Sequence, residues 1–449
     1  MSCIPFLRPG RPEDIIARRG AEAITRTQFL RDLAALTQAL PDRPYVLNHC
    51  EDRYRFLVGL AASLVRGQVS LFPSNRAPEV LASLARDYPG AYCLTDHPQP
   101  EEGSVMQVCR YDTHGDATGH ETAEPCFPVG QQVAIAFTSG STGVPKRYPK
   151  YWGGLVREAE VAGQRLELNA EGRGHVLATV PAQHMYGFVY SVVLPARWGY
   201  TVSAERPFYP EDIRRALAAR PGPTVLVTTP IHIRACLLDG AELPQIDFML
   251  SSTAPLDAGL AAQAEMRFGA RVVEFYGSTE TGAIASRRQG ETGVWRTFDD
   301  IGVFPEEEGF RVEAAYLPAP QALADLVEIR NEREFTLLGR SAEIVKIAGK
   351  RIALGDLNRH LLAIEGVRDG TFFLPDSREG REPRLTAFVV APGKRREEIL
   401  EALRCRIDPV FLPRPLRCVE TLPRNSTGKL PRGELLALYR EMEEKEGAE

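Results

Sequence analysis

Residues 137–150 gather hydroxyl, glycine and cationic groups in one short stretch, FTSGSTGVPKRYPK. Glycines let backbone N–H groups approach a ligand, hydroxyls donate hydrogen bonds, and Lys146 adds a full positive charge. The apolar run QVAIAF precedes this stretch, and a helical pattern rich in Ala, Glu and Leu follows around residues 152–166. The sequence therefore predicts a strand and an anion-binding loop that precedes a helix, whose N-terminus adds partial positive charge.

This loop does not match two common nucleotide-binding patterns. A Walker loop needs Gly-x4-Gly-Lys-Ser/Thr, but the glycines here are at 140 and 143, and Arg147 follows Lys146. The pairs Gly349-Lys350 and Gly428-Lys429 lack the first glycine of that pattern, and no GxGxxG follows a predicted strand. A phosphate site at residues 137–150 must therefore belong to another architecture.

The elements that would position this loop form an α/β pattern. At 449 residues the chain is long enough for two or more domains. Strand-like and helix-like segments alternate from about residue 24 to 290, which predicts βαβ units around a largely parallel sheet covered on both faces. The segments TVLVTT, DFMLSST and RVVEFYG read as strands that end in small or polar residues. Open α/β sheets bind ligands at such ends, so we expect one composite cleft there.

The pattern changes after residue 338. A polar-punctuated segment is followed by a helix over 355–364, the strands TFFLPD and LTAFVVA, and an amphipathic helix with Ile399, Leu400, Leu403 and Ile407 on one face. We therefore predict a large N-terminal domain over 1–338 and a small, mobile α+β domain over 339–449.

Composition excludes several classes of protein. A net charge of −5, with basic residues scattered among acidic ones, leaves no basic footprint for nucleic acid. The eight cysteines form no CxxC pair, which indicates reduced thiols, and the eight histidines form no HExxH or Cys/His zinc pattern. The N-terminus lacks a secretory h-region, and the longest apolar run, 56–65, is too short to span a membrane. We expect a soluble cytoplasmic enzyme.

Five stretches, in order, carry a resemblance to the adenylate-forming superfamily of acyl-CoA synthetases, nonribosomal peptide adenylation domains and luciferases. TSGSTGVPK resembles its phosphate loop, PAQHMYG (181–187) its Pro-x-x-His-x-x-Gly segment, and YGSTETG (276–282) its Tyr-Gly-x-Thr-Glu motif. GRSAEIVKIAGKRI (339–352) is similar to its hinge and hairpin, and PRNSTGK (423–429) to its C-terminal lysine loop. Asp325 lies fifteen residues before Arg340, the spacing between this family's ribose-binding aspartate and its hinge arginine.

The resemblance implies that a carboxylate attacks the α-phosphate of ATP, that pyrophosphate leaves, and that a thiol then takes the acyl group. It assigns Glu280 to Mg²⁺, with Thr138 as a second metal ligand, Thr279 to the α-phosphate, and Lys429 to the bridge between carboxylate and phosphate. It assigns the nucleotide to Thr138, Ser139, Gly140, Ser141, Thr142, Gly143, Lys146, Tyr276, Gly277, Asp325 and Arg340. His184 would gate the carboxylate or thiol path, and the acid pocket would contain His184, Phe188, Ser251, Ser252, Thr253, Gly277 and Gly282. For several of these residues the structural alternatives stay open: a solvated Lys146, a core Tyr276, a surface Asp325 or a packed core His184.

The substrate and the acceptor follow from weaker features. The segment HMYGFVYSVV has no acid to pair with an amino group, so a free amino acid is disfavoured and an aryl or medium acyl acid fits better. The short chain most resembles the small ligases of aryl-polyene and xanthomonadin-type pathways, which load benzoate-like acids onto an acyl carrier protein. CoA presents the same thiol and is the alternative acceptor. Arg147 and Ala342 depart from the family's phosphate loop and hinge, which leaves open a homologue that binds nucleotide or carrier without turnover.

Overall fold

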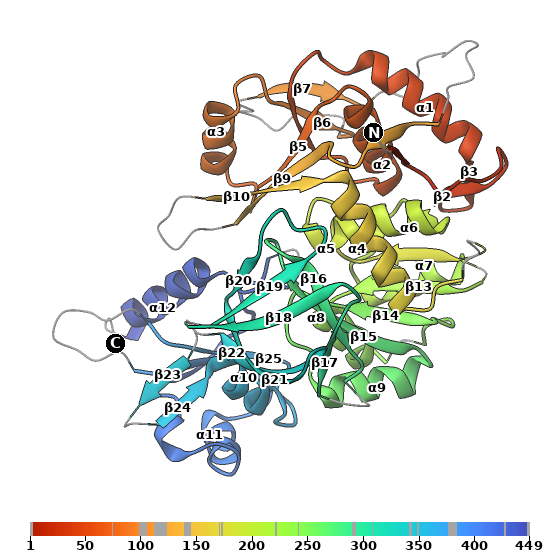
Figure 1. The fold of residues 1–449 in the computed structure, drawn as a ribbon. Helices are drawn as coiled ribbons and strands as arrows, with labels where there is room; N and C mark the ends of the chain where they lie inside the picture. Colours follow the sequence, from red (N-terminus) through yellow and green to blue (C-terminus); the bar gives the residue numbers. More distant parts are fainter. Residues whose placement is uncertain are drawn as a thin grey trace.

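Two large sheets and a smaller C-terminal region make up the molecule in this computed structural model (Figure 1). The structure describes residues 3–73, 75–97, 106–111, 124–138, 145–169, 171, 174–220, 222–240, 242–289, 293–307, 309–340, 344–347, 350–375, 384–425 and 428–446. The predicted surface loop at 112–124 lies almost wholly outside this part of the chain.

The six-stranded sheet occupies the upper part of Figure 1. Its strands, in spatial order, are β10 (Lys146–Tyr151), β9 (Gln132–Thr138), β5 (Val69–Phe72), β4 (Tyr45–Asn48), β6 (Tyr92–Thr95) and β7 (Gln107–Arg110). Only the β10–β9 pair is antiparallel. The predicted alternation of strands and helices around a largely parallel sheet is therefore confirmed for β4, β5 and β6.

The eleven-stranded sheet lies below it. Its strands, in spatial order, are β21 (Asp325–Asn331), β22 (Glu334–Arg340), β17 (Trp295–Thr297), β16 (Gly282–Arg287), β15 (Arg271–Ser278), β14 (Phe248–Ser251), β13 (Thr224–Thr228), β11 (His175–Ala178), β12 (Thr201–Ser203), β2 (Ile15–Arg19) and β3 (Glu22–Thr25). The central run from β15 to β2 is parallel, and antiparallel strands extend both edges.

Helices cover these sheets (Figure 1). Those of the first 338 residues are α1 (Arg26–Ala39), α2 (Arg53–Val65), α3 (Pro78–Asp87), α4 (Trp152–Arg165), α5 (Met185–Phe188), a π-helical turn (Val189–Val193), α6 (Leu194–Trp198), α7 (Pro210–Ala218), α8 (Pro230–Leu238) and α9 (Ala258–Phe268). α2 is apolar nearly all round and packs against β4 and β5 of one sheet and β12 of the other. A helix with this pattern is stable only when buried, so α2 ties the two sheets into one core.

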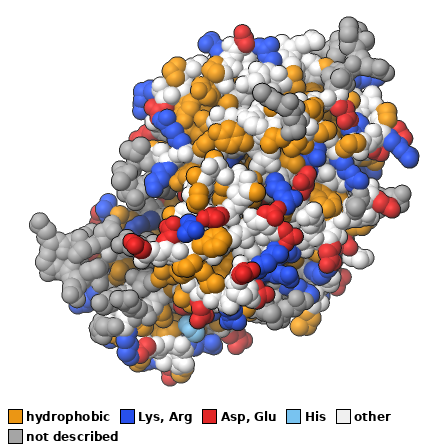
Figure 2. Space-filling view, viewed as in Figure 1, with side chains coloured by type: hydrophobic (Ala, Val, Ile, Leu, Met, Phe, Trp, Pro, Cys, Tyr) orange, Lys and Arg blue, Asp and Glu red, His pale blue; other side chains and the backbone are white. Residues whose placement is uncertain are grey.

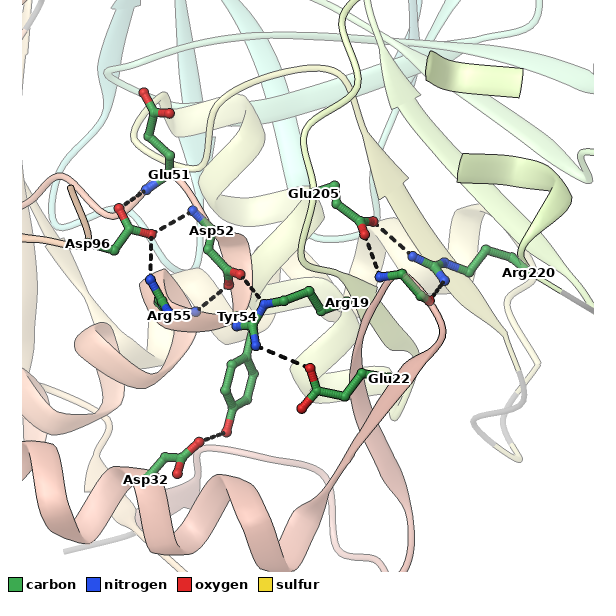
Figure 3. A network of polar contacts seen from close by, with 11 residues as sticks. Arg19, Glu22, Asp32, Glu51, Asp52, Tyr54, Arg55, Asp96, Glu205 and Arg220 are labelled. Carbon is green, nitrogen blue, oxygen red and sulfur yellow. Dashed lines mark hydrogen bonds and ion pairs between the residues drawn. The ribbon is translucent and has the colours of Figure 1, made fainter. Parts of the chain in front are cut away.

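Polar contacts fix the N-terminus of α2 in place (Figure 3). Asp52 caps the helix by accepting from the backbone N–H of Arg55, and its other oxygen accepts from Arg19 Nε at 2.7 Å. Asp96, after β6, accepts from the backbone N–H groups of Glu51 and Asp52. Because Arg19 lies on β2 of the eleven-stranded sheet and Asp96 follows β6 of the six-stranded sheet, this network connects the two sheets.

The remaining strands form small sheets. β18 (Ile301–Glu306), β19 (Gly309–Ala314) and β20 (Gln321–Leu323) make an antiparallel sheet that the sequence pattern did not reveal, and β1 (Cys3–Pro5) pairs with β8 (Cys126–Pro128). This last pair corrects the expectation of reduced thiols for two of the eight cysteines. Cys3 and Cys126 form a disulfide with their Cα atoms 5.7 Å apart.

The chain after residue 338 has its own hydrophobic clusters. Its elements are β23 (Ile344–Ile347), β24 (Lys350–Ala353), α10 (Leu354–Leu362), β25 (Asp369–Phe373), β26 (Thr386–Val390), α11 (Arg396–Arg404), a 3₁₀ turn (Pro409–Phe411), β27 (Leu416–Cys418) and α12 (Arg432–Glu446). Ile399 and Leu403 of α11 are fully buried, as the amphipathic pattern predicts. The domain boundary at 338 falls inside β22 and stays a prediction, as does the mobility of the smaller part.

Two further expectations concern surfaces. On the face in Figure 2, basic and acidic side chains are interspersed, with no continuous basic region. Among the residues that the structure describes, no helix is long and apolar enough to cross a membrane. The cytoplasmic location stays a prediction.

Candidate active site

The carboxyl ends of four parallel strands lie next to one another in the eleven-stranded sheet, in the order β11, β13, β14 and β15. The strand registers align Thr228 with Ser251 and Ser251 with Glu274. The hydroxyl of Tyr186, in the segment after β11, donates to the carbonyls of Thr228 at 3.2 Å and Leu250 at 2.5 Å. Hydrogen bonds from Tyr186 therefore connect the 181–187 segment directly to the ends of β13 and β14, where the cleft is predicted.

His184 forms the N-cap of α5 through its ring. Nδ1 accepts from the backbone N–H of Tyr186 at 3.3 Å, so a neutral ring carries its proton on Nε2. Burial first, and the charge of Lys429 second, lower the pKa of His184 to about 3, which keeps the ring neutral at ordinary pH. Gly187 completes this segment because a Cβ there would lie only 2.0 Å from the carbonyl oxygen of Pro181.

Lys429 reaches this cleft from the C-terminal region. Its charge acts on His184, and the neighbouring Gly428 packs beside Ile231 at the start of α8, where a Cβ would lie 3.1 Å from Cγ2 of Ile231. A tight loop presents the lysine: the backbone N–H of Lys429 donates to Oδ1 of Asn425 at 2.9 Å. The structure thus brings together two predicted site residues that are 245 positions apart, as their residue numbers give.

Arg424 holds the lysine loop against β25. Its guanidinium makes a bidentate pair with Asp369, at 2.7 and 2.6 Å, and Nη1 also donates to the carbonyl oxygen of Gly428 at 2.6 Å. Bidentate arginine–carboxylate pairs fix geometry as well as charge. Sequence reasoning missed both residues, because the pairing joins positions far apart in the chain.

Tyr276 and Asp325, both predicted to bind the nucleotide, lie in contact with each other. The hydroxyl of Tyr276, near the end of β15, donates to Oδ2 of Asp325 at 2.5 Å. The tyrosine ring packs against Trp295 and Phe335, with centroids 5.2 and 5.8 Å away. The β21–β22 hairpin pairs the backbone of Asp325 with that of Arg340, which explains why fifteen residues separate them.

The predicted phosphate loop connects two antiparallel strands. Thr138 ends β9 and Lys146 begins β10, and the two residues are register partners. The prediction that a helix N-terminus follows the loop is wrong, because β10 intervenes before α4 begins at Trp152. Ser139, Gly140, Ser141, Thr142 and Gly143 lie outside the described residues.

Tyr148 connects the two predicted metal ligands. The side chains of Glu280 and Thr138 act on its hydroxyl, whose pKa is raised by burial first and by the charge of Glu280 second. Along β10, Lys146, Tyr148 and Lys150 alternate with residues of the opposite face. If a strand had been predicted here, this alternation would have placed Tyr148 on the same face as Lys146 and Lys150.

The donor atoms around Glu280 fit a magnesium ion. Glu280 offers a carboxylate and Thr138 offers a hydroxyl, both oxygen groups that bind Mg²⁺ in nucleotide sites. Among the described residues, no group of three or more His, Cys, Asp or Glu side chains could form an all-protein metal site. That arrangement suits an ion held by one carboxylate together with the phosphates of a substrate.

The residues predicted for the acid pocket have distinct surroundings. Phe188 is fully buried and packs edge-on against Phe72, with centroids 4.9 Å apart. Ser251 is fully buried and Ser252 donates to the carbonyl oxygen of Phe275, while Thr253 has a φ of +76°. In the β15–β16 hairpin Gly277 is paired with Ala283 and Gly282 with Ser278, and the hairpin carries Thr279 and Glu280 at its turn. Their roles in acid binding stay predictions.

The two departures from the family pattern have different outcomes. Arg147 points toward α3, where Nη2 pairs with Asp87 at 3.1 Å and the guanidinium stacks over Tyr88. Arg147 lies on the face of β10 opposite to Tyr148, and its positive charge is paired there with Asp87. Ala342 lies outside the described residues.

Comparison with known proteins agrees with this geometry. Residues 37–328 match the family model described as AMP-binding enzyme. A 4-coumarate–CoA ligase of Halorhodospira halophila is 30% identical over 305 residues, covering 65% of this chain and 73% of the relative. The structure of ATP-bound MatB from Rhodopseudomonas palustris has a TM-score of 0.80 at 18% identity, with 97% of both chains covered. The o-succinylbenzoate CoA synthetase (MenE) from Bacillus subtilis, in complex with its acyl-adenylate, also has a TM-score of 0.80, at 17% identity, with 94% of this chain and 95% of that chain covered.

The fold and the residues around the strand ends define an AMP-forming acid–thiol ligase. This chain belongs to the AMP-binding enzyme family.

Proposed function

We propose that the chain activates a benzoate-like aromatic acid as its adenylate and passes the acyl group to a phosphopantetheine thiol, that of an acyl carrier protein. The observation that carries this proposal is the position of the lysine loop: Gly428 packs beside Ile231 and Thr229 after β13, and the charge of Lys429 acts on His184. Both reactants of the first step are anions, so an ammonium group between them lowers the barrier by neutralising charge as it develops.

In the first step a carboxylate oxygen attacks the α-phosphorus, and the bond to the bridging oxygen of pyrophosphate breaks. Lys429 would hold the carboxylate and the α-phosphate in line, while Tyr276, Asp325 and Arg340 would hold the nucleoside. Glu280 and Thr138 would hold a magnesium ion, which neutralises phosphate charge when bound. In the second step the thiol sulfur attacks the acyl carbon, AMP leaves, and the thiol proton passes to solvent.

The aromatic class of acid is supported by the aromatic residues of the segment 184–190 and by the name of the 4-coumarate–CoA ligase relative. Neutral His184 has no charge to pair with a second carboxylate on the substrate. The acceptor has two candidates. The resemblance to small ligases that load carrier proteins favours a carrier protein, whereas the names of the 4-coumarate and o-succinylbenzoate relatives favour CoA.

A product assay tests both parts of the proposal. The full-length protein is incubated with ATP, Mg²⁺ and one acid at a time from sets of benzoates, cinnamates and fatty acids, with either CoA or a phosphopantetheinylated carrier protein. AMP release and the mass of the thioester are measured. We expect a thioester from an aromatic acid and none from fatty acids.

A matched pair of variants gives the control. Lys429→Ala should remove AMP release, whereas Arg404→Ala, an exposed position on α11 of the same region, should leave it unchanged. Activity with fatty acids alone would overturn the aromatic substrate class, and a thioester with CoA alone would overturn the carrier acceptor. ATP binding with no AMP from any acid would favour a binding protein without turnover.

A further inference from the structure

A cavity of about 270 Å³ lies between β10, α4 and the turn that carries Glu280. Its lining includes Lys150 of β10, Glu158 of α4, Glu280 and Thr281 of the turn, and Tyr316 of the segment between β19 and β20. The cavity therefore borders the predicted metal-ligand turn. Two of its charged residues, Lys150 and Glu158, have no role in the steps described above.

Lys150 contacts the turn at Glu280. Nζ donates to the backbone carbonyl oxygen of Glu280 at 3.3 Å, and the charges of Glu158 and Glu280 both act on the ammonium group. Lys150 lies on the same face of β10 as Tyr148, which lines the same cavity as Glu280 and whose hydroxyl feels the charge of Glu280. One strand, which begins at Lys146 after the phosphate loop, thus contacts the backbone of Glu280 and places a hydroxyl near its carboxylate.

Glu158 contacts the other end of the turn. Oε1 accepts from the backbone N–H of Ala283 at 2.8 Å and from the hydroxyl of Tyr190 at 2.9 Å, and the side chain is buried. A carboxylate buried at this depth costs free energy unless hydrogen bonds and an opposite charge compensate it. The two hydrogen bonds and the nearby Lys150 supply that compensation.

Tyr316 and the turn itself complete the arrangement. The hydroxyl of Tyr316 lies 3.1 Å from the carbonyl oxygen of Thr281 and 3.2 Å from that of Ala283. Within the turn, the backbone N–H groups of Ser278 and Thr281 each donate to the other residue's hydroxyl at 3.2 Å. The backbone from 278 to 283 is therefore fixed on both sides, and Lys150 is the residue of β10 that donates a hydrogen bond to it.

We propose that Lys150, with Glu158 as its counter-charge, is a positioning residue that holds the Glu280 turn against β10 and so couples the phosphate loop to the metal-ligand carboxylate. The proposal rests on the proposed function only in taking Glu280 as the magnesium ligand of bound ATP. If so, Lys150 does not contact ATP, but it increases the factor by which Mg²⁺ raises the affinity for ATP.

The test measures ATP binding to the full chain by calorimetry, with excess Mg²⁺ and separately with EDTA. Lys150→Met should lower the Mg²⁺-dependent gain in affinity by about tenfold, the scale of one lost charge-assisted hydrogen bond. Affinity in EDTA should stay within about twofold, since the variant removes no nucleotide contact. Lys150→Arg, which keeps a donor and the charge, should recover most of the gain.

Two further variants make the result specific. Glu158→Gln keeps an acceptor oxygen for Ala283 and Tyr190 and removes the charge. The double variant Lys150→Met/Glu158→Gln should lose no more of the Mg²⁺-dependent gain in affinity than Lys150→Met alone, because the two residues act as one unit. Arg157→Met, on α4 but paired outward with Asp300, should change neither measurement.

The outcomes separate this inference from the proposed function. Equal weakening of ATP binding in Mg²⁺ and in EDTA would indicate a merely structural lysine and overturn the inference, as would an unchanged gain in Lys150→Met. If Lys150→Met does not fold, additive losses in Lys150→Arg and Glu158→Gln would overturn it. A wild-type chain that binds ATP no better with Mg²⁺ than without would overturn the proposed function as well.

Discussion

At the scale of single residues, the glycine that follows Thr281 shows how tightly the metal-ligand turn is built. Gly282 has a φ of +70°, a conformation that L-residues adopt only at a cost. A Cβ at this position would lie 2.5 Å from Oε2 of the buried Glu158. Position 282 therefore excludes a side chain for two independent reasons, and both act on the turn that carries Glu280.

Gly282→Ala should lower the free energy of unfolding by about 2–3 kcal/mol, from backbone strain and displacement of a buried carboxylate. It should also weaken Mg²⁺-dependent ATP binding. Gly433→Ala is the control, since a Cβ there meets nothing within 4 Å and the position is within α12, where alanine is favoured. Urea unfolding of the two variants checks the prediction, and equal stabilities would contradict it.

Sequence reasoning identified the residues whose types are tied to a short motif, such as His184, Glu280 and Lys429. It did not find Tyr148, Lys150, Glu158, Arg424 or Asp369. Each of these acts through a partner distant in sequence, and a tyrosine, lysine or glutamate outside a motif is indistinguishable from a surface or core residue until the fold is known. The disulfide between Cys3 and Cys126 was mispredicted for the same reason, as 123 residues separate the pair.

At the scale of elements, the βα alternation was predictable because each buried parallel strand is a short apolar run between turn residues. The strand β10 was not predictable in this way, since KRYPKY has no apolar alternation. Its strand conformation comes from pairing with β9 across the phosphate loop. The error mattered, because the prediction placed a helix N-terminus where the structure has a strand, and that strand carries Tyr148 and Lys150 toward the Glu280 turn.

The lysine loop depends on a second element, β25, through the pair of Asp369 and Arg424. Asp369→Asn removes the charge and one strong acceptor of the bidentate pair, so the loop should sample more conformations. We expect adenylation to slow by about tenfold, while ATP affinity stays within about twofold, because the ground state makes little use of Lys429. Rapid-quench measurement of adenylate formation checks this, and a loss confined to ATP affinity would contradict it.

At the scale of the whole molecule, three histidines make stability depend on pH: His232 is buried, and His49 and His184 are half-buried. Burial, as the first cause in each case, lowers the pKa of His49 and His184 to about 3 and that of His232 to about 4. Nearby cations add to the effect: Arg76 beside His49, Lys429 beside His184 and Arg206 beside His232. All three rings are therefore neutral in the folded chain at pH 7.

The unfolded chain protonates these rings near pH 6.5, whereas the folded chain does so only near pH 3–4, so stability is present above pH 6.5 and is lost as the pH falls. Below pH 6.5 each ring should contribute a slope approaching about 1.4 kcal/mol per pH unit. Unfolding free energies between pH 7.5 and 5.5 check this, before most carboxylates titrate. His232→Gln should flatten the curve relative to wild type, and an unchanged curve would show that His232 protonates freely in the fold.

The central claim is that Lys429, brought to the strand ends, assists attack of a carboxylate on ATP. The most direct measurement is exchange of labelled pyrophosphate into ATP in the presence of aromatic acids, for wild type, Lys429→Ala and Arg404→Ala. We predict acid-dependent exchange in wild type and Arg404→Ala, and a loss of about 100-fold in Lys429→Ala, the scale for one electrostatic group at a reacting centre. Exchange that persists in Lys429→Ala, or wild-type exchange that does not depend on any acid, would contradict the claim.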